Sequence, residues 1–335
     1  MKNDMYKYNT LGINISSEIQ IPELEKSEVK CPDVRIEYGK VESPNLKSEN
    51  EFSKTIRDKN GFLCYIKGEG GVRVCDKSKI IVSPENGSEK RGFRFLVSGI
   101  GLGLLLHLRG FVTLHASAVA VQDRVIAFIG QKGMGKSTTA AALHAQGYPV
   151  VTDDLLVLDT ANDCVRAYPG FPYLKLTPES IAESVNENPD RIPKIDPGGP
   201  KHSFAAEGTF AKDTLSVGCI YVLDYQEERE EGKKPALPYS REIEGKEAFI
   251  ELVRNSYVAR LLPEEAVSKR HLEHSAEIAQ AVSVRRLYRK PSLEHLPELV
   301  SHIEQAQHFE QDHHPGDRTS DNRATFSVQH EKEEG

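Results

Sequence analysis

The sequence predicts an α/β protein in which a small β-rich domain precedes a nucleotide-binding domain. Residues 130–137, GQKGMGKS, fit the phosphate-loop pattern G-x-x-x-x-G-K-[S/T] without a mismatch. A β-branched and aromatic run leads into this loop from Arg124, and the segment after it is typical of a helix that ends at Gly147. Strand, loop and helix form the arrangement that the pattern requires. The loop therefore predicts a site for a nucleoside triphosphate.

Composition divides the chain into three parts. Residues 1–88 contain short apolar or alternating runs separated by Gly, Pro, Asn and charged residues, which is typical of a small β-rich domain. Residues 89–308 hold the phosphate loop, and we assign them to the nucleotide domain. Residues 309–335 are polar with almost no apolar content, so we expect a disordered tail.

The most apolar stretch, Phe95–Leu108, is shorter than the roughly 20 residues that cross a bilayer. Arg91, Arg94 and Arg109 flank it, and several glycines lie within it. These features favour a buried helix over about 92–109. We expect a soluble protein without a membrane partner.

Two strands are expected before the loop helix, one from Thr113 and one from Arg124, joined as a hairpin through residues 122–123. After the helix, an apolar strand from Tyr148 ends in two acidic residues. The chain then continues extended from Leu155.

The C-terminal half alternates loops, strands and helices. Residues 185–213 are rich in Pro, Gly, Asn and charge, which predicts a long mobile loop, either a lid or docking segment or an inert surface excursion. The sheet resumes at Val217. The other expected elements are a solvated charged turn at 226–234, a helix at 246–262, helices at about 264–281 and 292–307, and a strand from Val282 between those two.

Composition also narrows the partners and the compartment. The 335 residues include 43 Lys and Arg against 50 Asp and Glu, a net charge of −7, so no general attraction to nucleic acid is expected. The five cysteines are scattered without C-x-x-C pairs, which argues against a zinc site or a disulfide framework and fits a reducing cytosol. The N-terminus lacks the apolar core of a signal peptide. We expect a cytoplasmic protein.

The glycine-rich loop carries the expected nucleotide contacts. Its backbone N–H groups turn inward around phosphate oxygens, Lys136 reaches the outer phosphates, and the Ser137 hydroxyl ligates Mg²⁺. The residues assigned to the nucleotide are Gly130, Gln131, Lys132, Gly133, Met134, Gly135, Lys136, Ser137 and Thr138.

Two adjacent acids and one histidine complete the candidate site. Asp153 and Asp154 end a strand 17 and 18 residues after Lys136, where a second carboxylate-bearing strand is expected beside a phosphate loop. One carboxylate can hold Mg²⁺ and the other can accept a proton from an attacking hydroxyl, but neighbouring strand residues point to opposite faces, which leaves a structural role open for one of them. We assign Asp153, with Ser137, to the metal. His115 lies one strand from the loop, which favours function over the commoner structural role of a lone histidine.

Positive charge for the transferred phosphoryl group has three candidates: Lys132 in the loop, Lys201 in the segment expected to be mobile, and Arg254 on a helix. Arg254 ranks first, because its neighbours are apolar and would hold it in place.

Residues 114–159 resemble the catalytic domain of the HPr kinase/phosphorylase family, the bacterial serine kinases with a phosphate loop. The shared pattern is L-H, a hairpin, a glycine loop ending in GKS, a helix closing in G-Y, and an apolar strand ending in D-D. The resemblance implies a fold related to phosphoenolpyruvate carboxykinase, with ATP as the donor. It also implies that His115 lies near the transferred phosphoryl group and that Asp154 is the base that activates an acceptor serine.

The chain departs from this family after the double aspartate. The family carries a Glu-x-Arg-Gly-x-Gly segment there, whose Glu completes the Mg²⁺ site and which serves the reverse, phosphorolytic reaction. Here the region from Tyr168 reads YPGFPYLKLTPES, and a Glu-x-Arg at 227–229 lies in the charged turn. We therefore expect the forward kinase reaction without phosphorylase activity.

The N-terminal part is similar instead to the leading domain of HPr kinase-like proteins, some of which accompany lasso-peptide biosynthesis and phosphorylate a serine at the C-terminus of the precursor peptide. Runs that fit this branch begin at Tyr8, Gly110, Leu252 and Val282. The resemblance implies a peptide or protein acceptor other than HPr and is compatible with a homo-oligomer.

The leading hypothesis is an ATP- and Mg²⁺-dependent kinase that phosphorylates a serine of a peptide or protein. Three alternatives stay open: an HPr-type regulatory kinase, a small-molecule hydroxyl kinase, and a nucleotide-gated binding module with slow or absent turnover. The intact set of Lys136, Ser137 and the two aspartates argues against the last.

Overall fold

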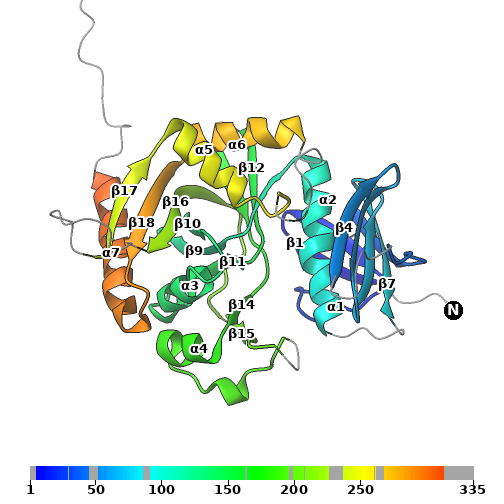
Figure 1. The fold of residues 1–335 in the computed structure, drawn as a ribbon, viewed down its shortest axis with the longest axis horizontal. Coiled ribbons are helices and arrows are strands. Elements are labelled where there is room, and N and C mark those ends of the chain that lie inside the picture. Colours follow the sequence, from blue (N-terminus) through cyan, green and yellow to red (C-terminus); the bar gives the residue numbers. More distant parts are fainter. Residues whose placement is uncertain are drawn as a thin grey trace, which may run out of the picture.

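A computed structural model describes residues 5–28, 30–44, 52–85, 91–162, 164–195, 199–206, 208–225, 237–259, 261 and 268–312. Over these residues the chain is a mixed α/β protein with a seven-stranded, a nine-stranded and a two-stranded sheet. The seven-stranded sheet lies at one end of the molecule, followed by one helical segment and then by the larger sheet with its helices (Figure 1).

The N-terminal part of the chain forms the seven-stranded sheet. Its strand order is β1-β2-β3-β7-β6-β5-β4, with parallel pairing of β3 to both β2 and β7. Alternate residues of β1, β3 and β7 are buried, which fits a sheet with one face on a core. The strands are β1 Tyr6–Thr10, β2 Ile13–Ser17, β3 Val34–Tyr38, β4 Ser53–Asp58, β5 Gly61–Ile66, β6 Gly70–Val74 and β7 Lys79–Pro84.

The turn between β1 and β2 ties this sheet to the larger one. The backbone N–H of Leu11 donates to the carbonyl of Pro169 at 2.9 Å, and the Thr10 hydroxyl donates to the carbonyl of Gly170 at 2.9 Å. Gly170 in turn donates its N–H to the carbonyl of Val151 at 2.8 Å, on a strand of the larger sheet. The β1–β2 turn is thus linked by hydrogen bonds, through Pro169 and Gly170, to the strand that contains Val151.

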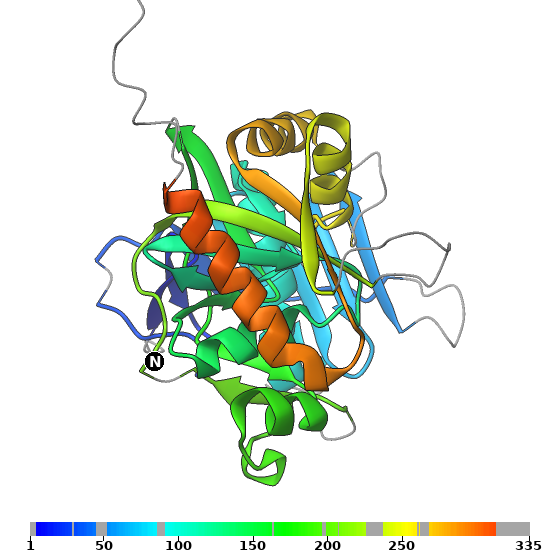
Figure 2. The same cartoon turned by 90° about the vertical axis from the view of Figure 1, so that its left-hand side faces the viewer.

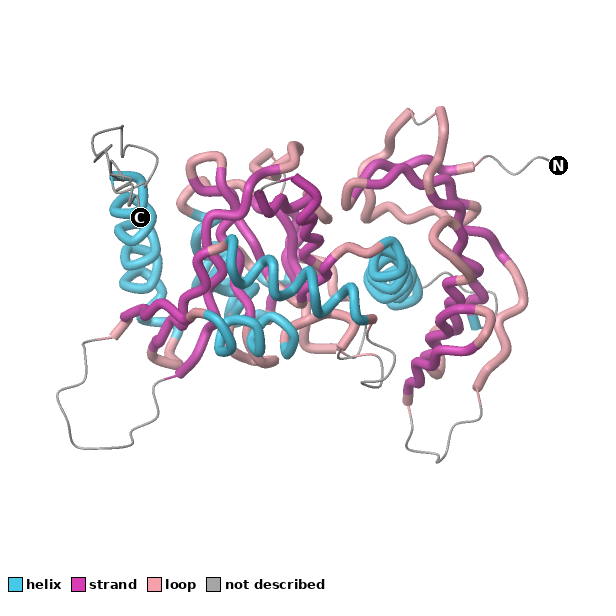
Figure 3. Tube along the Cα trace, turned by 90° about the horizontal axis from the view of Figure 1, so that it is seen from above, coloured by secondary structure: helices cyan, strands magenta, loops and turns pink. Residues whose placement is uncertain are grey.

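The predicted buried helix is confirmed. It runs from Arg91 to Arg109 as α1 (Arg91–Phe95), a π-helical segment (Leu96–Gly101) and α2 (Leu102–Arg109). Among the described residues it is long and apolar enough to cross a membrane by length and composition, yet 67% of its apolar window is buried inside the protein. Figure 3 shows this helix end-on between the two large sheets.

Small residues on the helix allow this close packing. A Cβ added at Gly101 would lie 3.1 Å from Val72 of the N-terminal sheet, and one added at Gly103 would lie 2.9 Å from the Tyr257 ring on the opposite side. One hydrophobic core therefore includes the N-terminal sheet, the helix, Val157 of β12 in the larger sheet, and Leu155 just before that strand.

The larger sheet holds three parallel neighbours, β10, β16 and β18, within an otherwise antiparallel arrangement. Its strands are β8 Val112–Leu114, β9 Ser117–Val121, β10 Arg124–Ile129, β11 Val150–Asp153, β12 Leu156–Asn162, β13 Cys164–Tyr168, β16 Leu215–Tyr225, β17 Tyr239–Ile243 and β18 Ser283–Arg289. The carboxyl ends of parallel strands are the usual position of ligand sites in such sheets.

Helices cover both faces of this sheet. α3 (Lys136–Ala145) and α7 (Leu296–Asp312) pack on one face, and α5 (Gly245–Arg254) and α6 (Lys269–Ala281) pack on the other. In Figure 2, α7 crosses in front of the sheet, while α5 and α6 lie together above it.

The expected hairpin before the loop forms through Gln122 and Asp123, both with left-handed φ values of 49° and 60°. The strand expected from Thr113 is interrupted, however. Its first half, β8, pairs with β12, whereas its second half, β9, pairs with β10 and β11. His115 lies in the break between them.

Residues 185–213 are more ordered than their composition predicts. After α4 (Pro178–Val185), a 3₁₀ turn (Pro189–Arg191) leads to β15 (His202–Ala205), which pairs with β14 (Tyr173–Leu176). The excursion is polar because it lies at the surface, but its backbone is bonded internally: Ile195 N–H donates to the carbonyl of Lys201 at 2.9 Å. Residues 196–198 and 207 lie outside the described residues.

The C-terminal helices differ from expectation at their ends. The helix expected over 246–262 stops at Arg254, and α6 begins after Ser268, whose hydroxyl caps it. α7 continues to Asp312, so the first residues assigned to the tail are helical. The remaining tail residues, 313–335, and the predicted charged turn lie outside the described residues.

Two buried histidines join the helical segment to α6. His107 on α2 and His271 on α6 are 5% and 2% exposed, and their ring centroids lie 5.3 Å apart. Burial lowers the pKa of each to about 4, with a smaller contribution from the neighbouring His271 and Arg57 for His107 and from His274 for His271. Both are therefore neutral in the folded protein at pH 7.

These histidines predict a loss of stability in mild acid. Below pH 6.5 these two histidines bind protons in the unfolded chain but stay neutral in the folded chain. Their contribution to the unfolding free energy is therefore fully present above pH 6.5 and is lost as the pH falls toward 4. The loss is about 2 kcal/mol per histidine at pH 5. Replacing both residues by Leu should weaken the decrease in unfolding free energy between pH 7.5 and pH 5, measured with urea. A His295→Leu control, on a partly exposed residue, should decline like the wild type. An equal decline in the double variant would contradict the assignment.

Candidate functional site

The glycine-rich loop, residues 130–135, connects β10 to α3 at the carboxyl ends of the parallel strands. The expected strand, loop and helix are therefore present. Gly135 caps the start of α3 with a φ of 82°, and a Cβ at this position would lie 2.2 Å from Nη2 of Arg289. Both the left-handed backbone and the close guanidinium require glycine here.

Lys136 and Asn255 fix the start of the loop. The buried Lys136 Nζ donates to the carbonyl of Gly130 at 2.8 Å and to that of Gln131 at 3.3 Å. The Asn255 side chain accepts from Gly130 N–H at 2.9 Å and donates to the Glu251 carbonyl at 2.9 Å. The Asn255 carbonyl also accepts from His115 N–H at 2.8 Å, so one residue links the loop to the candidate histidine.

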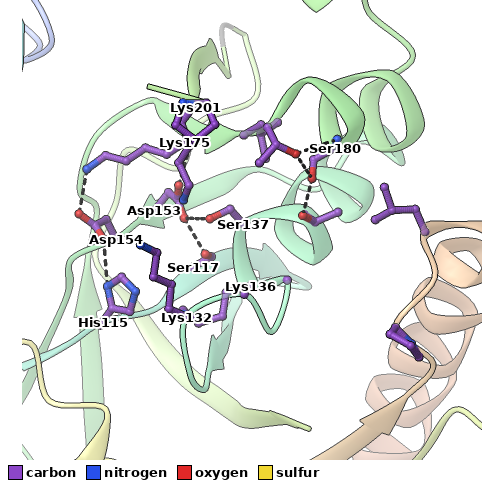
Figure 4. Close-up of a pocket in the computed structure, with 18 of the residues that line it drawn as sticks. His115, Ser117, Lys132, Lys136, Ser137, Asp153, Asp154, Lys175, Ser180 and Lys201 are labelled. Atoms are coloured by element: carbon purple, nitrogen blue, oxygen red, sulfur yellow. Dashed lines mark hydrogen bonds and ion pairs between the residues drawn. The ribbon is translucent and has the colours of Figure 1, made fainter. Parts of the chain in front are cut away.

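A cavity of about 420 Å³ lies against the loop and the start of α3. It brings together most of the residues predicted from the sequence (Figure 4). The predicted residues that line it are His115, Lys132, Gly133, Gly135, Lys136, Ser137, Thr138, Asp153, Asp154 and Lys201.

Asp153 is the buried acceptor at the centre of this cavity. Its Oδ1 accepts from the Ser117 hydroxyl at 2.6 Å and from the Ser137 hydroxyl at 2.9 Å, and its Oδ2 accepts from Lys175 N–H at 2.7 Å. A carboxylate and a hydroxyl beside a phosphate site fit Mg²⁺, which is commonly held by one or two carboxylates and by substrate phosphates. Among the described residues, no group of three or more His, Cys, Asp and Glu side chains is arranged as a metal site.

Asp154 faces the same cavity because its backbone leaves the strand conformation. Its φ is 81°, a left-handed value that is uncommon outside glycine, and it breaks the alternation that would send neighbouring side chains to opposite faces. Asp154 Oδ1 lies 2.9 Å from His115 Nδ1, and its Oδ2 accepts from Lys175 Nζ at 2.8 Å. Both acids therefore line the cavity, and neither is left with a purely structural position on the opposite face of the strand.

The charge state of Asp154 follows from these neighbours. Burial alone would raise the pKa of its carboxyl group, but the Lys175 ammonium and the His115 ring outweigh burial and hold the pKa well below its usual range. Asp154 is thus an ionised carboxylate at neutral pH. The Lys175 ammonium lies 4.7 Å from the ring centroid of Phe95, so the buried helix also contacts the site.

A second cavity, of about 910 Å³, lies on the other side of the loop and also includes His115 and Lys132. The remaining predicted residues, Gly130, Gln131, Met134 and Arg254, line this cavity and not the first. The Arg254 side chain is 70% exposed and lies 3.5 Å from Glu251 Oε1. Its apolar neighbours in the sequence therefore do not bury it, contrary to the reason for ranking it first.

The residues of the site that were missed from the sequence include Ser117, Lys175, Asn255 and Arg289. Lys175 lies in the segment YPGFPYLKLTPES, which replaces the Glu-x-Arg segment of the family that residues 114–159 resemble. This replacement was the one feature of the sequence that could have drawn attention to Lys175. Asn255 follows the last residue of α5, and Arg289 ends a strand. No local pattern distinguishes either from an ordinary polar residue.

Comparisons with known proteins add little to this geometry. No family model and no curated protein matches the chain. Among solved structures, it is similar to the Hpr(Ser) kinase/phosphatase from Coxiella burnetii, with 12% sequence identity and a TM-score of 0.33, over 59% of this chain and 98% of that one. A similarity at this level supports no argument about activity, so function is argued from the site.

Asn255 should be needed for the stability of the loop. In Asn255→Ala, the buried N–H of Gly130 loses its acceptor, which should lower the unfolding free energy by about 1–3 kcal/mol and speed amide exchange at Gly130. Denaturant titration and hydrogen exchange measure the two effects. Asn9→Ala, which removes an exposed side-chain hydrogen bond on β1, is the control and should change neither. Unchanged exchange at Gly130 in Asn255→Ala would show that this hydrogen bond does not hold the loop.

Proposed function

We propose that the protein is an ATP-dependent kinase that transfers the γ-phosphoryl group to a serine hydroxyl of a peptide or protein. The observation that carries this proposal is the ionised Asp154, paired with His115 and Lys175 in the cavity that also contains Lys136 and Ser137. A carboxylate beside a triphosphate site is the arrangement needed to activate a hydroxyl group. The resemblance of residues 114–159 to bacterial serine kinases agrees with it.

The nucleotide would lie along the glycine-rich loop. The loop amides and the first turn of α3 present N–H groups and the positive end of a helix dipole to phosphate oxygens, and Lys136 adds a buried charge. Ser137 and Asp153 would hold Mg²⁺. When bound, this ion neutralises charge on the outer phosphates.

Transfer then requires one base and one acceptor. The acceptor oxygen forms a bond to the γ-phosphorus while the bond from that phosphorus to the β–γ bridging oxygen breaks, and ADP leaves. The proton of the hydroxyl passes to the Asp154 carboxylate. Lys175 and His115 fix the position of that carboxylate before the acceptor arrives.

The second cavity supports an acceptor larger than a free alcohol. It has about 910 Å³ of space, adjoins the first cavity at His115, and carries the charged side chains of Arg254, Glu251 and Arg286. A peptide segment would use such a surface, whereas a small alcohol would leave it unfilled. The serine hydroxyl itself, a cytoplasmic location and a homo-oligomer rest on the sequence and remain part of the proposal.

Asp154→Asn should abolish most of the transfer. Loss of the base should lower the rate by about 10²–10⁴-fold, measured with γ-labelled ATP and Mg²⁺ on a degenerate mixture of serine-containing peptides. Asp213→Asn, on an exposed residue, is the control and should keep full activity. Equal transfer in Asp154→Asn and wild type would refute the base assignment. Transfer to free serine would favour the small-molecule kinase, and ATP binding without any transfer would favour the binding module.

Lys175→Met should shift the pH dependence of transfer. Without the ammonium, Asp154 loses the largest of the effects that lower its pKa, so the pKa rises and the acid limb of kcat/KM should move to higher pH. Lys175→Arg keeps the charge and should leave the limb near its wild-type position. A pH profile measured on the same peptides tests this, and an unmoved acid limb in Lys175→Met would show that Lys175 does not set the ionisation of the base.

A further inference from the structure

Arg289 lies beside the glycine-rich loop, where no sequence motif placed a functional residue. It ends β18 and pairs in register with Tyr225, the last residue of β16. Its Nη2 donates to the Met134 carbonyl at 2.6 Å and to the Tyr225 hydroxyl at 3.1 Å, and its guanidinium carbon lies 5.0 Å from the Tyr225 ring centroid. The side chain is thus held by one contact to the loop and by two contacts to Tyr225 of β16.

This guanidinium is buried without a carboxylate. Arg289 is 5% exposed, its Nε has no hydrogen-bond partner, and no ion pair within the described residues includes it. Arg286, three residues earlier on the same strand, shows the ordinary arrangement, with ion pairs to Asp224, Glu247 and Glu251. A buried charge without a counter-ion is costly, so such a residue is expected where an anion binds.

The position of Arg289 in the cavity determines which part of a bound triphosphate it would contact. It lines the cavity of about 420 Å³ together with Gly135 of the loop and Thr138 of α3, and with Pro291 and Leu293 just beyond β18. In Figure 4 the chain that follows β18 lies on the side of this cavity opposite His115 and Asp154. Asp154 and His115 are the groups assigned to the transferred phosphoryl group, so Arg289 faces the other end of the triphosphate.

We infer that Arg289 binds the phosphates that stay on the nucleotide after transfer, so that it holds ADP as well as ATP. The inference rests on the proposed function for the orientation of the nucleotide. The guanidinium would supply its positive charge to the bound diphosphate, while its present bonds to Met134 and Tyr225 keep it in place. The contact with Gly135 also makes the loop and β18 one phosphate-binding unit.

The test compares ADP with adenosine by isothermal titration calorimetry in the presence of Mg²⁺. Arg289→Gln should weaken ADP binding by about tenfold or more, because a charged hydrogen bond to phosphate is lost, and should leave adenosine binding unchanged. The affinity of Arg289→Lys for ADP should lie between that of the wild type and that of Arg289→Gln. The matched control is Arg73→Gln, on a partly buried arginine paired with Asp58 in the N-terminal sheet, which should bind ADP like the wild type.

A measurement on the wild type covers the case in which Arg289→Gln does not fold. In protein labelled in its arginine side chains, ADP should shift the Nε–H resonance of Arg289 and adenosine should not. Unchanged ADP affinity in the variants, an equal loss for adenosine, or an unshifted resonance would each overturn the inference. If ADP binding depends on Arg289 but no phosphoryl transfer occurs, the inference stands and the kinase proposal is refuted. If transfer occurs but ADP binding does not change in the Arg289 variants, the kinase proposal stands and the inference is refuted.

Discussion

The site depends on the way Lys175 holds two neighbouring carboxylates. Its backbone N–H binds Asp153 and its ammonium binds Asp154, so one residue on β14 fixes both acids against the loop. Without this compensation, two adjacent carboxylates in a buried cavity would repel each other and one would take up a proton. The left-handed backbone of Asp154 brings the second carboxylate into the cavity, and Lys175 makes that position electrostatically acceptable. The separate roles proposed for the two acids follow from their separate partners.

The remaining parts of the site are held by single residues that join distant segments. Asn255 connects the loop, α5 and the backbone of His115, while Arg289 connects the loop to β18. The break between β8 and β9 places His115 outside the strand ladder, at the wall that the two cavities share. The residues of the loop divide between the two cavities: Gly133 and Gly135 line the first, Gly130, Gln131 and Met134 line the second, and Lys132 lines both.

The sequence predicts the parts of this arrangement that depend on local pattern. The strand before the loop, the helix after it, the hairpin at residues 122–123 and the buried helix all follow from periodicity and turn chemistry, and the structure contains them. Lys175, Asn255 and Arg289 could not be found in this way, because each acts on residues far away in the chain. The conformation of Asp154 was also hidden, since nothing in the pair of acids marks a left-handed residue. The prediction of a mobile loop over residues 185–213 was wrong for the described part of that segment. A polar surface segment and a disordered one have the same composition, and the sequence does not show the backbone hydrogen bonds that order this one.

The glycines of the helix between the sheets have a consequence for the limits of the folding unit. Because a Cβ at Gly101 would meet Val72 and one at Gly103 would meet Tyr257, α2 packs closely against both neighbours, and removal of the N-terminal sheet would expose core side chains of the helix. A chain that began at residue 89 would keep every residue of the proposed site yet leave the apolar surface of this helix uncovered. The change in composition near residue 88 is therefore a boundary in the sequence and not in the core. The N-terminal sheet and the larger sheet with its helices should therefore be expressed together and should unfold as one cooperative unit.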